Sequence, residues 1–142
     1  MIRFVEKAFF FVLAGPAVLR AAGRLCLHRR QRIDTLADTM RAVTVFRWPV
    51  LRHPAYLAAT VSCLLWILPP FSYGRCYKRS LLLLDLWSRC GLAPTLHLGA
   101  KAGADHEVAG HQDLDRQFHA WVTTSADGPW TSDNGHRSIW SG

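Results

Sequence analysis

The stretch Gly74–Gly91, GRCYKRSLLLLDLWSRCG, decides how the rest of the sequence is interpreted. A glycine and an arginine precede Cys76, four consecutive leucines follow, and a second glycine closes the segment. Apolar residues at helical spacing indicate a helix, and a glycine just after them is typical of its C-terminal end. The pattern predicts a helix over about 76–90, with Cys76 in its first turn and Gly91 just past its end.

A thiol at this position has a chemical consequence. The positive end of the helix dipole and the unbonded backbone N–H groups of the first turn both favour a thiolate. Arg75, Lys78 and Arg79 add positive charge nearby. The same N–H groups can hold an oxyanion that forms on an attacked carbonyl. The segment therefore predicts a nucleophile at Cys76 together with part of an oxyanion hole.

A second segment, QFHAWV over Gln117–Val122, supplies a candidate base. Its alternation predicts a strand with His119 and Trp121 on one face and apolar side chains on the other. Acyl transfer by a thiolate needs a general acid and base, usually a histidine, and a group that orients it. His119 is the leading candidate for the acid and base.

The residues that follow predict a hairpin. SADG over 125–128 is a turn signal, because Asp-Gly favours positive φ, and PWTS over 129–132 continues as a partner strand. This hairpin would place residues 131–134 across from His119. Asp133 is therefore expected to orient the imidazole and to complete a Cys-His-Asp triad.

The first 68 residues predict helices without a convincing strand. One helix is expected over 3–31, with a kink or break at Pro16. A second covers 35–48 with Asp34 as its N-cap, and a third begins at Pro54 and runs to about Leu68. Residues 1–68 are thus expected to form a basic N-terminal helical region.

The loop signal PPFSYG over 69–74 marks the predicted boundary, and a catalytic core is expected over 69–142. A helix, a strand over 94–99, the strand over 117–124 and its partner follow in that order. Helices followed by a helix and strands indicate an α+β fold rather than a wound parallel sheet.

The chain has a net charge of +7, and residues 1–54 account for all of it, with ten basic residues against three acidic ones. This charge suits an acidic peptide or a membrane surface, or it is a solvated arginine-rich helix face. No base-stacking motif accompanies it, so no nucleic-acid partner is expected. The two apolar stretches, of 12 residues over 8–19 and 14 over 55–68, are shorter than the roughly 20 residues of a membrane span. They favour buried helices and leave peripheral membrane contact open.

The other cysteines are interpreted as core residues, because each lies in an apolar helical pattern; they are Cys26, Cys63 and Cys90. No C-x-x-C pair is present, which indicates a reducing cytosol. A metal site built from Cys90 and the histidines at 97, 106 and 111 matches no familiar ligand spacing. No metal and no cofactor are therefore expected.

Three segments resemble the transglutaminase-like domain of the lasso peptide leader peptidases, the B proteins of lasso peptide biosynthesis. GRCYKRSLLLLDLWSRCGL resembles the family's cysteine helix, APTLHLG its following strand, and FHAWV its histidine motif. The resemblance covers about residues 69–135, roughly half of the chain. The sequence departs from the family at Thr123, where an acidic residue is common, and in a longer loop over 100–116. The departures bear on the third catalytic residue and on the substrate cleft.

The resemblance implies a transglutaminase-like (papain-like) cysteine protease core with Cys76 as nucleophile and His119 as base. The family's aspartate matches Asp133 best, with Asp127 as the second choice. The implied reaction removes the leader from a ribosomally made lasso precursor peptide, freeing the amine that a partner cyclase uses. Because residues 1–68 do not resemble a leader-recognition domain with strands, a separate leader-binding protein is expected.

Two alternatives stay open. The same triad would serve amide transfer to an amine instead of hydrolysis. The chain could also be a non-catalytic membrane-peripheral or partner-binding adaptor, in which Cys76 is an unreactive core thiol.

Overall fold

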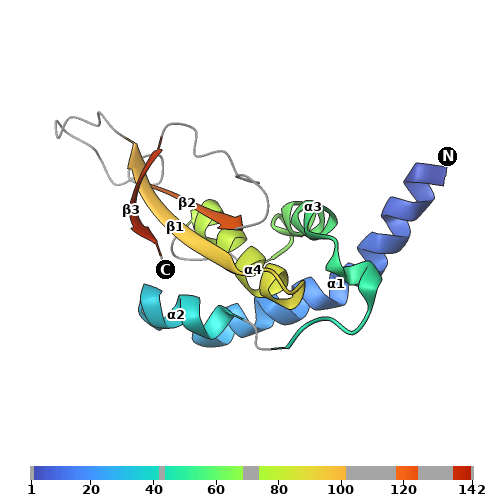
Figure 1. Cartoon of the computed structure of the whole chain (residues 1–142), viewed down its shortest axis with the longest axis horizontal. Helices are drawn as coiled ribbons and strands as arrows, with labels where there is room; N and C mark the ends of the chain where they lie inside the picture. The colour runs from blue at the N-terminus through green and yellow to red at the C-terminus, as the bar shows by residue number, and fades with distance from the viewer. Residues whose placement is uncertain (1, 42–43, 69–73, 102–117, 125–135, 142) are drawn as a thin grey trace.

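The computed structural model describes residues 2–41, 44–68, 74–101, 118–124 and 136–141. The fold is α+β, as expected, with helices followed by an antiparallel sheet (Figure 1). The elements in chain order are α1 (Ile2–His28), α2 (Ile33–Met40), the 3₁₀ helix η1 (Pro49–Arg52), α3 (Pro54–Leu64), α4 (Gly74–Arg89), β1 (Pro94–Lys101), β2 (Phe118–Thr124) and β3 (His136–Ser141).

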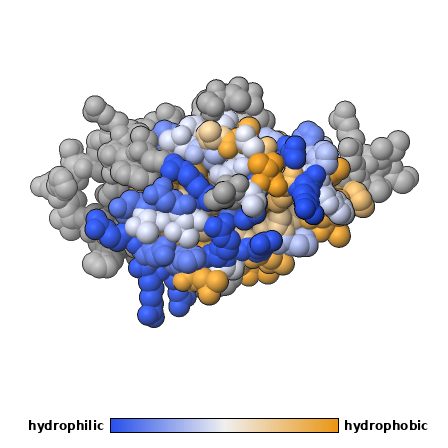
Figure 2. Space-filling model, turned by 60° about the horizontal axis from the view of Figure 1, so that its bottom comes forward, coloured by the Kyte–Doolittle hydropathy of each residue, from blue (hydrophilic) through white to orange (hydrophobic). Residues whose placement is uncertain are grey.

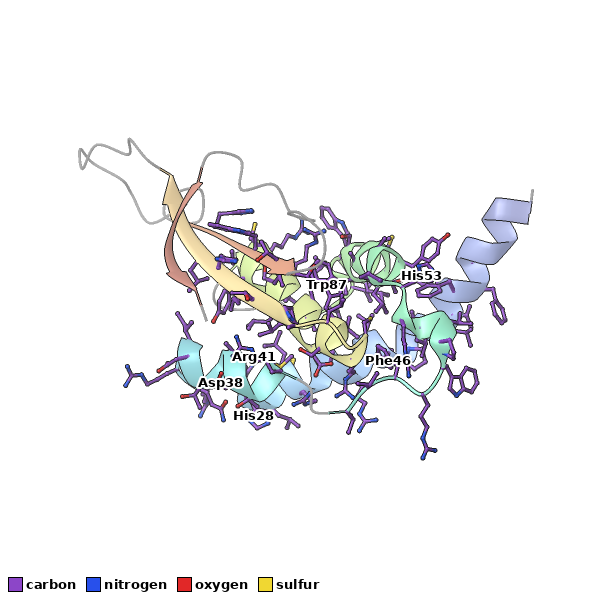
Figure 3. The ribbon with its side chains drawn as sticks, viewed as in Figure 1. His28, Asp38, Arg41, Phe46, His53 and Trp87 are labelled. Atoms are coloured by element: carbon purple, nitrogen blue, oxygen red, sulfur yellow. The ribbon has the colours of Figure 1, made fainter. Side chains whose placement is uncertain are left out.

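Helix α4 is the central element of the fold. It packs against α1, α2 and α3 on one side and against β1 and β2 on the other (Figure 1). All four residues of Leu81–Leu84 are buried, because neighbours surround the helix on several sides. A helix that is apolar around most of its circumference is typical of such a position. Trp87 is also buried, and its Nε1 donates a hydrogen bond to the Pro54 carbonyl at the start of α3, 3.2 Å away (Figure 3).

Both ends of α4 use a glycine with positive φ. Gly74 has a φ of 81° and Gly91 a φ of 82°, a region that side chains disfavour. At the C-terminal end, Gly91 N donates to Ser88 O and Leu92 N donates to Trp87 O. These two bonds form a Schellman motif, which confirms Gly91 as the C-terminal glycine. The helix begins two residues earlier than the sequence predicted.

The sheet has the order β2-β1-β3, and β1 is antiparallel to both neighbours. Leu96, Ala120 and Val122 on one face of the sheet are buried in the core beside α4. Gly99 lies directly opposite His119 in the register of β1 and β2.

The strand β3 lies beyond the predicted hairpin in the chain, and it pairs with β1 on the edge away from β2. The hairpin itself stays a prediction. Residues 125–135 join β2 to β3, a connection much longer than the two-residue loop that fixes a tight hairpin. The predicted turn and PWTS strand lie outside the described residues.

Helix α1 runs continuously through Pro16 and changes direction along its length (Figure 1). A proline inside a helix removes one backbone hydrogen bond and bends the helix. Because the helix does not break there, Ala8–His28 is long and apolar enough to cross a membrane by length and composition. The expectation of a stretch too short to span is therefore wrong on length, although core helices and signal sequences meet the same criterion.

The second helix differs from its prediction. It begins at Ile33, so Asp34 lies in the first turn rather than at the N-cap, which is Arg32. It ends at Met40, well before the predicted end near residue 48. The third helix begins at Pro54 as predicted, with the proline in its first turn.

One hydrophobic core crosses the predicted boundary at residues 68 and 69. Buried side chains of α1, α2 and α3 join those of α4 and the sheet in a single cluster. A backbone hydrogen bond also joins the two parts of the chain, because Phe46 N donates to the Arg89 carbonyl at the end of α4. The division into 1–68 and 69–142 remains a prediction about organisation along the chain.

Candidate active site

Cys76 lies in the first turn of α4, and its side chain is exposed. The backbone N–H groups of the first turn have no acceptor within the helix, so they are available to a bound anion or carbonyl oxygen. Gly74 provides the left-handed turn by which the chain enters the helix. The predicted nucleophile is therefore at a helix N-terminus and accessible from solvent.

The other cysteines only partly match their predicted core positions. Cys26 and Cys63 are exposed, so the interpretation of both as core thiols is wrong. Cys90 is half-buried, and its Sγ donates a hydrogen bond to the Leu51 carbonyl. Burial raises the pKa of Cys90 to about 11, although Arg52 acts in the opposite direction. Three exposed thiols thus exist, and Cys76 differs from the others in its place at a helix start.

Helix α4 contacts the histidine strand directly. Ser80 Oγ donates a buried hydrogen bond to the Ala120 carbonyl, 2.9 Å away. Residues 76 and 80 lie one turn apart on the same side of the helix. The start of α4, with Cys76, therefore lies within about one helical turn of the backbone that carries His119.

The side chain of His119 is on the other face of the strand from the helix core. Ala120 and Val122 pack toward α4, so alternation along β2 places His119 with Trp121 on the opposite face. The fold thus brings the helix start close to the histidine strand, while the imidazole projects from the other face of that strand.

Two histidines stack on one tryptophan on this face of the sheet. The centre of the Trp121 ring lies 5.9 Å from the centre of the His119 ring and 5.4 Å from that of His97. The interplanar angles are 19° and 15°. Trp121 is buried, whereas both histidines are half-buried. Trp121 therefore fixes the plane of both imidazoles.

His97 has a second contact that orients it. Its Nε2 lies 2.8 Å from Thr123 Oγ1 on β2. Burial lowers the pKa of His97, because the charged imidazolium is harder to desolvate. Sequence reasoning considered His97 only as a metal ligand. The signal that could have located it is the alternation of the APTLHLG strand, but the pairing register was needed to place it beside Trp121.

An exposed aromatic lies beside the start of α4, where the sequence suggested no role. The guanidinium carbon of Arg75 lies 3.4 Å from the centre of the Trp66 ring, which is cation–π geometry. Trp66 and Ile67 are largely exposed. Arg75 precedes the candidate nucleophile, so Trp66 and Arg75 form an amphipathic surface next to Cys76, the Trp66–Arg75 surface.

Lys78 differs from its predicted part in the site. The side chain is buried, and desolvation lowers its pKa, with a further decrease from Arg75 and an opposing effect of Cys26. Burial thus acts against the ammonium form that was expected to add positive charge near Cys76. Arg75 is exposed and carries this part of the expected field.

The predicted third residue, Asp133, and the second choice, Asp127, both lie outside the described residues. The histidines at 106 and 111 do so as well. Within the described part of the chain, no group of three His, Cys, Asp or Glu side chains is arranged to hold a metal ion. The described site thus consists of Cys76, the histidine strand and the two aromatic contacts.

Comparison with protein-family models, with curated proteins and with solved structures found no match to this chain.

Proposed function

We propose that the chain is a cysteine peptidase of the transglutaminase-like type that removes the leader from a lasso precursor peptide. The observation that supports this most is the exposed Cys76 in the first turn of a helix that packs on the histidine strand. The resemblance of three segments to the lasso leader peptidases supplies the substrate class. The chemistry of a thiol at a helix start supplies the reaction class.

The proposed reaction begins with attack of the Cys76 thiolate on the carbonyl carbon of the scissile amide. A carbon–sulfur bond forms, and the carbonyl electron pair moves to oxygen, where backbone N–H groups of the α4 first turn stabilise it. Collapse of this intermediate breaks the carbon–nitrogen bond, and His119 gives its proton to the leaving amine. Water then attacks the thioester with His119 as base, which releases the leader and restores the thiol.

This reaction requires the imidazole of His119 to reach the sulfur of Cys76. His119 projects from the face of β2 away from α4, so substrate binding must also shift the strand or turn the imidazole before a catalytic hydrogen bond tightens. The stacking of Trp121 on His119 gives the imidazole a defined orientation before substrate binds. In this proposal an aspartate, Asp133 or Asp127, orients the imidazole from its other nitrogen.

The proposal includes two protein partners. A separate leader-binding protein presents the precursor, and a cyclase consumes the amine that cleavage releases. The Trp66–Arg75 surface beside Cys76 is suited to contact a peptide through apolar and acidic side chains. Transfer to an amine in place of water would use the same residues and differs only in the nucleophile that clears the thioester.

The test is mass spectrometry of a lasso precursor peptide incubated with the chain, with and without a leader-binding protein. We expect a single cut between leader and core that disappears in Cys76→Ala. His119→Ala should lower the rate by at least about 10²-fold, the usual scale for loss of a general acid and base.

Cys63→Ala is the matched control, because Cys63 is also an exposed thiol on a helix but lies far from a helix start. This variant should cleave at the parent rate. Cleavage that survives Cys76→Ala would exclude Cys76 as nucleophile. An absence of cleavage in every mixture, with Cys76 no more reactive than Cys63, would favour the adaptor.

A further inference from the structure

The side of α1 that faces away from the core is apolar. Four large apolar side chains on it are exposed: Phe9 by 62%, Val12 by 70%, Leu19 by 56% and Leu27 by 82%. At 3.6 residues per turn, these four positions fall on one side of the helix. The opposite side carries the buried Ala14, Val18, Ala21 and Leu25. The outer side of α1 is thus an apolar strip without a partner among the described residues.

The 3₁₀ helix η1 packs against α1 and adds two exposed apolar side chains, Val50 on η1 and Trp48 just before it. Figure 2 shows separate hydrophobic areas among hydrophilic surface on the side that is at the bottom of Figure 1, where α1 and α2 lie. We define the α1–η1 face by its six exposed apolar residues: Phe9, Val12, Leu19, Leu27, Trp48 and Val50. Exposed apolar side chains that gather on one side of a protein and are bordered by polar residues are typical of an interaction surface.

Positive charge borders the α1–η1 face. Arg20 follows Leu19 in the chain, and Arg47 precedes Trp48; both side chains are exposed. No acidic residue occurs between residues 7 and 33 or between residues 39 and 84. Aromatic and aliphatic side chains flanked by arginines match the boundary between the anionic headgroups and the acyl chains of a bilayer.

We propose that the α1–η1 face binds the surface of an anionic lipid bilayer, with α1 lying in the plane of the membrane. Phe9, Val12 and Leu19 enter the acyl boundary, Trp48 lies at the headgroup level, and Arg20 and Arg47 contact lipid phosphates. A second copy of this chain would bring its own arginines against Arg20 and Arg47, and like charges repel. This argues against a second copy as the occupant. The inference does not depend on the proposed reaction.

Contacts of α1 with the fold favour binding on the membrane over spanning it. Arg24 of α1 binds Asp85 of α4, whose side chain is only 1% exposed. Insertion of α1 across a bilayer would remove this partner and leave the core residues of α4 uncovered. Apolar contacts with the bilayer from the outer side require neither change.

The test is flotation of the full chain with vesicles of phosphatidylcholine alone and of phosphatidylcholine with about 30% phosphatidylglycerol, a fraction chosen to give the bilayer a negative surface potential. We expect binding to the anionic vesicles at low salt and release by high salt. Val12→Gln combined with Leu19→Gln should lower the partition coefficient by at least about tenfold. Each of Arg20→Gln and Arg47→Gln should lower it by about fivefold.

Ile67→Gln is the matched control, because Ile67 is 78% exposed and lies after α3, outside the α1–η1 face. This variant should bind as the parent chain does. All of the substituted residues are exposed, so circular dichroism should show each variant folded.

Several outcomes would overturn the proposal. These are equal binding to neutral and anionic vesicles, binding that Ile67→Gln removes and the Val12/Leu19 variant retains, and no binding at all. Light scattering that shows a dimer lost in the Val12/Leu19 variant would assign the face to a second copy. Resistance of bound protein to alkaline carbonate extraction would assign α1 to a span.

Discussion

At the residue scale, Trp121 connects the candidate base to the rest of the sheet. Its ring stacks on both His119 and His97, and the hydrogen bond between His97 and Thr123 fixes the far side of the stack. The sequence predicted His119 from its motif and its strand. It did not predict His97 in this place, because only the register of β1 against β2 brings the two histidines to one ring.

The lowered pKa of His97 predicts a pH-dependent stability. Burial holds the folded-state pKa of His97 below its unfolded value of about 6.5, so the unfolded chain binds more protons there. The stability that the fold has while His97 is neutral is therefore complete above about pH 6.5. It decreases as the pH falls toward the folded-state pKa of His97. His97→Gln keeps a polar side chain without the titration, and it should flatten the stability profile between about pH 5 and 7.

Urea denaturation at several pH values measures the effect of His97. The difference in slope between the parent and the variant should be positive and at most about 1.4 kcal/mol per pH unit, the value for one proton. An unchanged slope would mean that His97 titrates alike in the folded and unfolded chains. The difference between the two chains removes the contributions of the other histidines.

At the element scale, α4 was the most predictable part of the chain. Four leucines between two glycines determine a buried helix with a defined end, and the Schellman bonds at Gly91 agree with the pattern. The end of α2 and the pairing of β3 were not predictable, because both depend on tertiary contacts. Phe46 N donates to Arg89 O, which favours a non-helical chain where the apolar spacing alone predicted a helix.

Two glycines give a matched test of helix geometry. Gly91 has a φ of 82°, so Gly91→Ala should destabilise the chain by about 1 kcal/mol although there is room for the methyl group. Gly23 lies inside α1, and a methyl group on its Cα would meet nothing within 4 Å, so Gly23→Ala should stabilise the chain by about 0.5–1 kcal/mol. Thermal or urea unfolding measures both, and changes of the same sign would contradict the assigned geometry.

At the scale of the whole molecule, one core carries two different surfaces. The candidate active site combines the start of α4 with the histidine of β2, and the α1–η1 face combines the outer side of α1 with exposed residues at η1. Arg24 links the two helices by binding Asp85, which Arg89 also binds. A solvated arginine face on α1 was one interpretation of the charge, whereas the half-buried Arg24 pairs with the buried Asp85. No local pattern distinguishes the two roles.

Loss of Arg24 should destabilise the whole fold. Asp85 is buried, and Arg24→Ala leaves its carboxylate with Arg89 as the remaining arginine partner described. Breaking a buried ion pair costs about 3–5 kcal/mol, and the retained Arg89 places this change near the lower limit. Arg41→Ala is the control, because its pair with Asp38 lies exposed on α2 and contributes less than about 1 kcal/mol (Figure 3). Urea unfolding with equal losses for both variants would contradict the assigned burial.

The central claim is that His119 activates Cys76 as a nucleophile, and alkylation kinetics measure this without the precursor. The starting chain for this measurement carries Cys26→Ser and Cys63→Ser, so that Cys76 and Cys90 are the cysteines that remain. Cys90 stays a neutral thiol at the pH used, because its pKa is about 11. We expect iodoacetamide to modify Cys76 at about pH 6 at least about tenfold faster than in the same chain with His119→Ala, because an imidazolium stabilises the thiolate. Equal rates in the two chains would contradict the claim and leave Cys76 as an exposed thiol without a base.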